Sequence, residues 1–185
     1  MRATWRCSRV VFLKGRAKHC RMQFSEGFPP VARADARILI LGSLPGQRSI
    51  DEQQYYAHPR NAFWPIMKEL YGTDGSYAQR LEGLLANQIA LWDVLAGSVR
   101  PGSLDGRIQL DSARANDFGS FLAEHIAIRL IAFNGNKAEQ LFKRFVDSSL
   151  VGPEIHMASL PSTSPAYAAM PFSGKLKVWR QTITA

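Results

Sequence analysis

Four short apolar runs divide the chain, and polar or Gly- and Pro-containing residues bound each of them. The runs cover residues 37–41, 89–95, 129–133 and 154–160. Most of their side chains are β-branched or otherwise apolar, which is typical of strands buried on both faces of a sheet.

Segments with helical periodicity lie between and after these runs. They cover residues 62–71, 77–86, 117–125, 137–146 and 176–182. Alternation of strand and helix is typical of parallel strands joined by right-handed crossovers. The pattern therefore predicts an α/β fold, a three-layer α/β/α sandwich with a central, mainly parallel four-stranded sheet.

The length and composition fit one domain. The chain has 185 residues, of which 46% are hydrophobic and 21% are charged, so it can bury one core but not two. No apolar run approaches the roughly 20 residues that a bilayer span needs. We expect residues 22–185 to form a single domain, preceded by a basic extension.

The positive charge is concentrated at the N-terminus. The net charge is +8, but residues 1–21 hold seven basic and no acidic side chains. The other 164 residues hold 16 basic and 15 acidic side chains, so bulk charge does not indicate a nucleic-acid partner for the domain. The extension is a basic arm that contacts phosphates, an organelle presequence, or non-native sequence upstream of a start at Met22. We favour the third alternative and expect residues 1–21 to be disordered or non-native.

Both cysteines, Cys7 and Cys20, lie in the same extension. A catalytic thiol or a metal cluster would need partners in the body of the chain, so we expect no metal and no cofactor. The charged start is not followed by the long apolar segment of a signal peptide. The sequence therefore predicts a protein without membrane contact in the bacterial cytoplasm or nucleoid.

The segments that follow the predicted strands are candidates for a ligand site. In a parallel sheet the loops after the strands meet at one edge, and ligands bind there. The four segments are residues 42–61, 96–105, 134–137 and 161–165, and all are polar or rich in Gly and Pro. We expect them to form one site.

The segment after the first strand carries the most specific sequence. It reads GSLPG at residues 42–46 and YYAHPRNAFW at residues 55–64. These elements resemble the first motif of the hypoxanthine-DNA (deoxyinosine) glycosylases in the uracil-DNA glycosylase superfamily. The resemblance implies a backbone loop that approaches a flipped base and an aromatic wall supplied by Tyr56. The alternative is that Tyr56 is only a half-buried loop aromatic.

The resemblance implies a set of base-binding residues around this wall. Its members are Gly42, Ser43, Leu44, Pro45, Gly46, Tyr56, His58 and Asp93. His58 either donates to the base or a phosphate, or stabilises the turn beside Pro59. Asp93 either reads a base edge or is a buried carboxylate satisfied by backbone N–H groups, which is the commoner arrangement.

Asn61 is the residue to which the resemblance assigns catalysis. Leu44 stands where mismatch-specific relatives carry a polar residue that positions water, and leucine can neither orient nor deprotonate water. The amide of Asn61 offers two donors and an acceptor, enough to hold a water or the leaving base, although it cannot act as a general base. The alternative is that Asn61 is the N-cap of the next helix.

The later segments resemble DNA-contacting parts of the same superfamily. Residues 91–94 (LWDV) and 102–105 (GSLD) resemble a stretch that lines the pocket rim, and residues 160–166 (LPSTSPA) resemble the loop that enters the minor groove. Leu160 is the expected apolar wedge. The implied DNA-binding set is Asn134, Gly135, Lys137, Leu160, Pro161, Ser162, Thr163 and Ser164.

The resemblance thus implies a monofunctional DNA glycosylase that excises deaminated bases, hypoxanthine foremost, during base excision repair. Its partner would be double-stranded DNA containing deaminated or mismatched bases, and the enzyme would act as a monomer. One alternative is a uracil or thymine mismatch glycosylase, and another is a non-catalytic module that binds lesions or single strands. A nucleotide-binding enzyme is disfavoured because neither GxxxxGK[ST] nor GxGxxG occurs.

Overall fold

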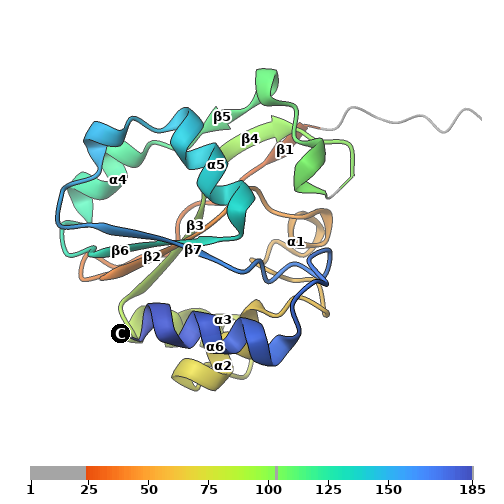
Figure 1. Cartoon of the computed structure of the whole chain (residues 1–185), viewed down its shortest axis with the longest axis vertical. Helices are drawn as coiled ribbons and strands as arrows, with labels where there is room; N and C mark the ends of the chain where they lie inside the picture. The colour runs from red at the N-terminus through yellow and green to blue at the C-terminus, as the bar shows by residue number, and fades with distance from the viewer. Residues whose placement is uncertain (1–23, 103, 185) are drawn as a thin grey trace, which may run out of the picture.

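A four-stranded parallel sheet lies at the centre of the computed structural model, which describes residues 24–102 and 104–184 (Figure 1). All three neighbouring strand pairs are parallel, and Ile40 in the second strand pairs with both Leu91 and Ala132. The strand order is β3 (Ile89–Asp93), β2 (Ile38–Gly42), β6 (Leu130–Asn134) and β7 (His156–Leu160). The predicted fold class is confirmed.

Helices cover both faces of this sheet (Figure 1). Leu39 and Leu41 of β2 belong to one hydrophobic cluster, and Ile40 belongs to the other, because successive strand residues point to opposite faces. One face carries α4 (Phe118–Glu124) and α5 (Asn136–Phe145). The other carries α2 (Phe63–Tyr71), α3 (Tyr77–Ala86) and α6 (Phe172–Ile183).

Burial of β2 on both faces makes the sheet a firm base for the loops that follow it. Leu39, Ile40 and Leu41 are each 0% exposed. Burying a side chain of this size contributes about 1.5–3 kcal/mol to folding. The packing of the sheet alone therefore fixes the carboxyl end of β2, without contacts from the loops.

Some helix ends show clear capping chemistry. The Ser76 hydroxyl accepts the Gln79 N–H, and the Gln79 side chain accepts the Ser76 N–H, so α3 begins with a capping box. Gly72 ends α2 with φ 68°, a conformation that glycine adopts at low cost. Helix α6 begins at Phe172 rather than 176, because Pro171 with φ −67° leads directly into its first turn.

A small antiparallel sheet next to the central one was not predicted. It contains β1 (Phe24–Glu26), β4 (Leu95–Val99) and β5 (Arg114–Ala115). The expected single strand 89–95 is wrong at its end: β3 stops at Asp93, and Leu95 already belongs to β4. The apolar run continues through the turn because Val94 and Leu95 are both buried.

Short helical turns make up much of the remaining chain. A six-residue helix, α1 (Gln47–Glu52), lies inside the segment that the sequence analysis treated as a loop. Its N-terminus has no side-chain cap, so the sequence offers no start signal. The 3₁₀ turns are η1 (Asp105–Arg107), η2 (Leu110–Ser112) and η3 (Ser148–Leu150).

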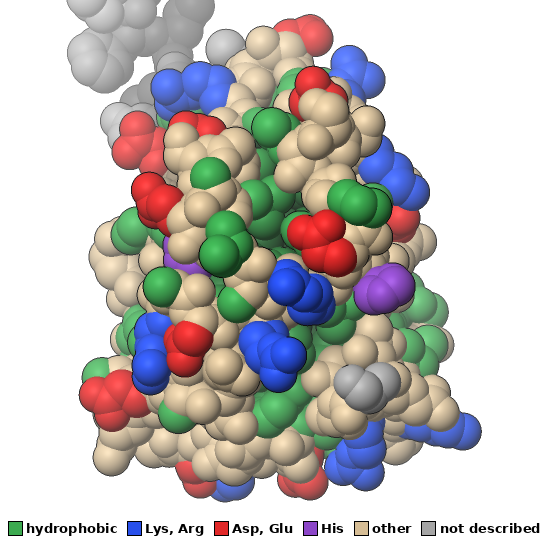
Figure 2. Space-filling view, turned by 90° about the vertical axis from the view of Figure 1, so that its left-hand side faces the viewer, with side chains coloured by type: hydrophobic (Ala, Val, Ile, Leu, Met, Phe, Trp, Pro, Cys, Tyr) green, Lys and Arg blue, Asp and Glu red, His purple; other side chains and the backbone are tan. Residues whose placement is uncertain are grey.

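The face at the amino ends of the central strands carries mixed charges. Figure 2 shows basic and acidic side chains interspersed there, with scattered apolar ones. Within residues 24–102 and 104–184, no helix is long and apolar enough to cross a membrane. In the same residues, no three His, Cys, Asp or Glu side chains cluster as metal ligands would. The predicted extension, residues 1–21, lies outside the described residues.

Candidate active site

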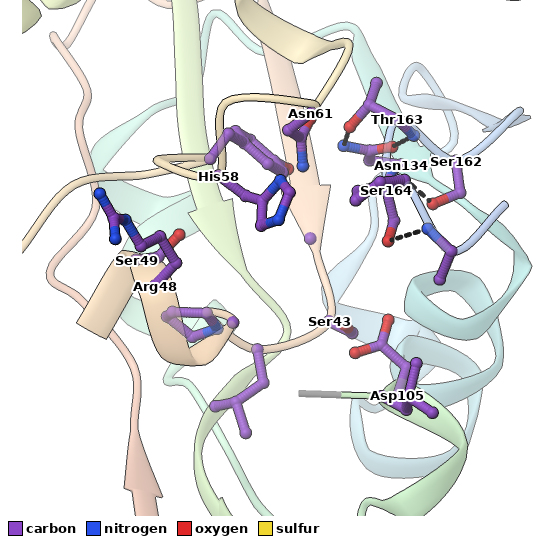
Figure 3. Close-up of a pocket in the computed structure, with 18 of the residues that line it drawn as sticks. Ser43, Arg48, Ser49, His58, Asn61, Asp105, Asn134, Ser162, Thr163 and Ser164 are labelled. Carbon is purple, nitrogen blue, oxygen red and sulfur yellow. Dashed lines mark hydrogen bonds between the residues drawn. The ribbon is translucent and has the colours of Figure 1, made fainter. Parts of the chain in front are cut away.

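A cavity of about 510 Å³ opens at the carboxyl ends of the four parallel strands, and segments that follow all four contribute to its wall. This is the place where ligands bind in parallel sheets. Figure 3 shows the polar side chains that surround it. The predicted residues that line it are Gly42, Ser43, Leu44, Pro45, Gly46, Tyr56, His58, Asn61, Asp93, Asn134, Ser162, Thr163 and Ser164.

Tyr56 forms an aromatic wall of this cavity. Its ring stacks on Phe63, with ring centroids 4.1 Å apart and planes 26° apart. Its φ of 55° lies in the left-handed region, which is uncommon for a residue with a side chain. Tyr55 beside it is instead buried at 3% exposure, and its hydroxyl donates to the Pro29 carbonyl. Both tyrosines line the cavity, but Tyr55 is almost fully buried and Tyr56 is the more exposed of the two.

Asn61 lies in the same cavity and also stabilises the start of α2. Its Oδ1 accepts the Phe63 N–H at 2.9 Å, a capping contact two residues along the chain. Figure 3 shows its amide nitrogen directed toward the cavity. The N-cap position of α2 belongs to Ala62, so the alternative that Asn61 is the N-cap is wrong by one residue, although Asn61 both lines the cavity and accepts a bond from the first residue of the helix.

His58 lies between these two residues in the sequence and also faces the cavity (Figure 3). Its Nδ1 accepts the Arg60 N–H at 3.1 Å, which stabilises the turn. Because Nδ1 is the acceptor, the proton of a neutral ring lies on Nε2. His58 can therefore stabilise the turn and still offer one N–H donor to a ligand.

Arg100 holds the GSLPG loop (residues 42–46) in place, and the sequence analysis missed it. Its guanidinium donates to the Leu44 carbonyl at 3.3 Å and to the Pro45 carbonyl. Its side chain is 1% exposed and lies 3.5 Å from the Asp105 carboxylate. The partners are separated by 55 and 56 residues, and no local motif signals such a bond.

Two further carbonyls of this loop are fixed by the chain that leaves β3. The Gly42 carbonyl accepts the Val94 N–H at 2.9 Å, and the Ser43 carbonyl accepts the Leu95 N–H at 3.1 Å. Four consecutive carbonyl groups, from residue 42 to residue 45, therefore accept hydrogen bonds from other parts of the protein and are not available to a ligand. These hydrogen bonds fix the shape of the loop, because a buried carbonyl that loses its donor costs free energy.

Asp93 is a buried carboxyl at the end of β3. It is 3% exposed, and its Oδ2 has no hydrogen-bond partner within the described residues. A side chain on Gly42 would overlap Asp93 Oδ1, so the glycine makes room for the carboxyl. Burial, followed by the charge of Asp105, raises the pKa of Asp93 to about 8, and the charge of Arg100 lowers it only partly. The expectation that backbone N–H groups satisfy Asp93 is wrong for Oδ2.

Asp105 also lines the cavity and lies beside Ser43 (Figure 3). Burial raises its pKa, while the Ser43 hydroxyl and the Arg100 charge lower it. Its side chain is 41% exposed, so solvent screens these effects. Lys137, in the first turn of α5, also lowers the pKa of Asp105 through its charge, which places this predicted DNA-binding residue near the rim although it does not line the cavity.

The serine loop (residues 161–167) forms the opposite wall. Asn134 at the end of β6 donates to the Thr163 hydroxyl and accepts the Thr163 N–H, both at 2.8 Å. Thr163 is 1% exposed, so these bonds fix the base of the loop. Ser162 and Ser164 accept backbone N–H groups two residues along, which stiffens its tip.

The final helix supports the same loop. Trp179 of α6 is 0% exposed and donates its indole N–H to the Pro161 carbonyl at 3.0 Å. Lys175 donates to the Tyr167 carbonyl at 2.9 Å, and its ammonium lies 5.1 Å from the Tyr167 ring centroid. Pro161 therefore contributes through its backbone and does not line the cavity.

Leu160 does not have the position expected of a wedge. It ends β7 with 1% exposure and belongs to the core cluster on the α2–α6 face, so it is not free to enter a duplex. Gly135 does not line the cavity either. Its φ is 97°, and a Cβ added at this position would lie only 2.9 Å from the Ser162 side chain, so a residue with a side chain would not fit. Two large apolar side chains at the mouth are exposed, Leu104 at 51% and Tyr167 at 38%. Leu104 belongs to the stretch expected at the pocket rim, whereas Tyr167 was not predicted.

Comparison with known proteins identifies the relatives of this arrangement. The family model of the uracil DNA glycosylase superfamily matches residues 29–183. A curated relative from Methanosarcina barkeri, named hypoxanthine DNA glycosylase, is 41% identical over 116 residues, which are 61% of this chain and 72% of the relative. Another with the same name, from Methanosarcina acetivorans, is 39% identical over 143 residues, 76% of this chain and 86% of the relative.

A solved structure agrees with the fold. The solution NMR structure of a candidate uracil DNA glycosylase from Methanosarcina acetivorans has a TM-score of 0.70 and 35% identity, and it covers 87% of this chain and 99% of that one. The family match extends from before β2 to the last turn of α6, and so includes every segment around the cavity. The chain therefore belongs to the uracil DNA glycosylase superfamily.

Proposed function

We propose that this protein is a monofunctional DNA glycosylase that releases hypoxanthine, a deaminated base, from DNA by hydrolysing the N-glycosidic bond of a flipped nucleotide. Membership of the superfamily and the names of the two Methanosarcina relatives support this function. The single observation that carries it is that Tyr56 and Asn61 line one cavity.

The cavity walls suit a flat base. Tyr56, backed by Phe63, offers the free face of a stacked pair on which a nucleobase can lie. The GSLPG loop lies at the end of β2 with four carbonyls already bonded, so it forms a wall of fixed shape. A preformed cavity avoids the cost of ordering the loop when the base binds.

Asn61 then acts on the bond that breaks. As the C1′–N9 bond lengthens, the sugar gains positive charge and the base gains negative charge. The Asn61 amide nitrogen, directed into the cavity, can donate to the base or hold the attacking water. Water adds to C1′, and an abasic site remains. Asn61 is also fixed by its bond to Phe63 N–H, so it needs no reorientation during the reaction.

The mouth of the cavity suits duplex DNA. Leu104 and Tyr167 are exposed apolar side chains from two different loops, and such side chains can fill the space that a flipped base leaves. Arg48 lines the same mouth and is exposed, and its guanidinium forms an ion pair with Glu52. We propose that the protein acts as a monomer on double-stranded DNA with deaminated or mismatched bases.

A cleavage panel tests this function. Excess protein is incubated with duplexes that contain deoxyinosine, deoxyuridine, deoxyxanthosine or a G·T mismatch, and alkali then reveals abasic sites. We expect cleavage at deoxyinosine. Cleavage at uracil alone would identify a uracil glycosylase instead, and lesion-dependent binding without base release would identify a binding module.

A further inference from the structure

Asp93 is a buried acid that the mechanism above does not use. Its Oδ2 has no hydrogen-bond partner within the described residues, although its side chain is almost fully buried. An unsatisfied buried carboxyl costs folding free energy, so its presence calls for a functional explanation. Asp93 also lines the cavity that holds Tyr56 and Asn61.

The position of Asp93 relative to Tyr56 matters for a bound base. A Cβ on Gly42 would overlap Asp93 Oδ1 and lie 3.2 Å from the Tyr56 hydroxyl oxygen. Asp93 therefore lies at the hydroxyl end of the Tyr56 ring. A base stacked flat on that ring would turn one edge toward the carboxyl.

Burial, and then the like charge of Asp105, raises the pKa of Asp93 and favours its neutral carboxyl. Tyr55 and Tyr56 approach it from the loop before α2, and each has a raised pKa, first through burial and then through the Asp93 charge. Asp105 approaches from η1 with the same sign of charge as ionised Asp93. Arg100, which follows β4, favours the ionised form, but its guanidinium is bonded to two loop carbonyls and lies beside Asp105.

We propose that Asp93 is the general acid that protonates the departing purine, an inference that rests on the proposed function. The C1′–N9 bond breaks and its electron pair passes to the purine. The proton of the Asp93 carboxyl goes to N7, the most basic ring nitrogen of the nucleoside, so neutral hypoxanthine leaves. Water adds to C1′ and releases a proton to solvent, and the Asp93 carboxylate regains a proton from solvent.

Asn61 and Asp105, which line the same cavity, are less suited than Asp93 to supply this proton. An asparagine amide does not ionise at neutral pH, so Asn61 can bind the base but not protonate it. Burial raises the pKa of Asp105 as well, but its side chain is 41% exposed and lies beside the Arg100 guanidinium, which favours the ionised form. Asp93 combines a cavity position with a free carboxyl oxygen, and a carboxylic acid kept neutral at pH 7 can donate to a developing negative charge.

The test is the pH profile of single-turnover hypoxanthine release by the wild type and by Asp93→Asn. For the wild type we expect the rate constant to fall tenfold per pH unit above about pH 8, where the carboxyl ionises. Asp93→Asn, which is isosteric and cannot give up a proton, should be about 100-fold slower at pH 7 and should lack this fall. Asp111→Asn, at an exposed acid outside the cavity, is the matched control and should keep the wild-type profile.

A second measurement needs no variant. Carbon-13 NMR of the wild type labelled at aspartate carboxyls should show one group that titrates near pH 8. A profile of Asp93→Asn that runs parallel to the wild type at every pH would overturn the inference, because ionisation of the substrate is common to both proteins. An Asp93 carboxyl that titrates near pH 4 would also overturn the inference. If the wild type releases no hypoxanthine at any pH, the proposed function itself fails.

Discussion

The two walls of the cavity are held in different ways. The GSLPG loop is buried, and its carbonyls bond to Arg100 and to the chain after β3. The serine loop is held at its base, where Asn134 and Trp179 bond to Thr163 and Pro161, and at Tyr167 by a single bond from Lys175 to the backbone carbonyl, while the Tyr167 side chain is 38% exposed. One wall is therefore rigid throughout, and the other ends in a surface that a partner can reach.

This difference separates the two tasks of a base-excising enzyme. Positioning of the base and of the catalytic amide requires fixed geometry, since small displacements are costly to catalysis. Contact with DNA requires exposed groups. Substitutions in the buried wall should therefore change chemistry or stability, whereas substitutions at the exposed tip should change DNA binding.

The largest effect is expected for Asn61→Ala. Loss of a positioned amide should lower the single-turnover rate constant about 1000-fold. Loss of the bond to Phe63 N–H should also cost about 1 kcal/mol of stability. Base release is measured with excess enzyme, and unfolding is followed in urea. Asn87→Ala, at an exposed asparagine that ends α3, serves as control. Retained activity would remove the catalytic assignment.

Arg100→Met should be next in size. It leaves the buried carbonyls of Leu44 and Pro45 without their donor, which should cost about 3 kcal/mol. Because the loop lines the cavity, the rate constant for base release should fall as well. Urea denaturation and single-turnover kinetics measure the two effects, with Arg33→Met, an exposed arginine, as control. Wild-type stability in Arg100→Met would show that the loop is held by other contacts.

The buried wall also predicts how stability depends on pH. The pKa of Asp93 is about 8 in the folded protein, against an ordinary value of 3.8 for an aspartate in the unfolded chain, so between these pH values the folded protein binds the extra proton. The free energy of unfolding should therefore fall as pH rises from 5 to 8, by at most about 1.4 kcal/mol per unit. Asp93→Asn removes this contribution. Urea denaturation at each pH compares the two slopes, and equal slopes would contradict the shift.

The smallest effect is expected at the exposed tip. Tyr167→Ala should weaken binding to a deoxyinosine duplex about tenfold, as loss of one stacking contact does, and leave stability nearly unchanged. Fluorescence anisotropy measures the affinity. Ile126→Ala removes a side chain that is 78% exposed at the amino ends of the strands, and should have no effect. Equal affinities for Tyr167→Ala and wild type would assign the tip no role in DNA contact.

The sequence allowed prediction of the central sheet and of the residues that share the cavity. The apolar runs placed four strands within two residues of their observed starts. The rule for parallel sheets predicted correctly that residues from 42–61, 134–137 and 161–165 lie together at one edge of the sheet. Tyr56 and Asn61 followed from the first motif. These features could be predicted because each depends on local periodicity or on contiguous sequence.

The features that were missed depend on contacts between distant residues. Arg100 reaches carbonyls 55 and 56 residues earlier, and nothing near it in the sequence indicates this. Leu160 was expected as an apolar wedge because residues 160–166 resemble the loop that enters the minor groove, but the pleat of β7 turns its side chain into the core. Position next to a functional loop does not determine which way a side chain points.

Support of the serine loop by α6 has a consequence for synthesis on the ribosome. Residues 161–167 emerge before Trp179 and Lys175, the two side chains that bond to Pro161 and Tyr167. A nascent chain that has not yet exposed α6 therefore lacks one wall of its cavity. Partly translated copies should therefore lack a complete pocket until α6 has been synthesised.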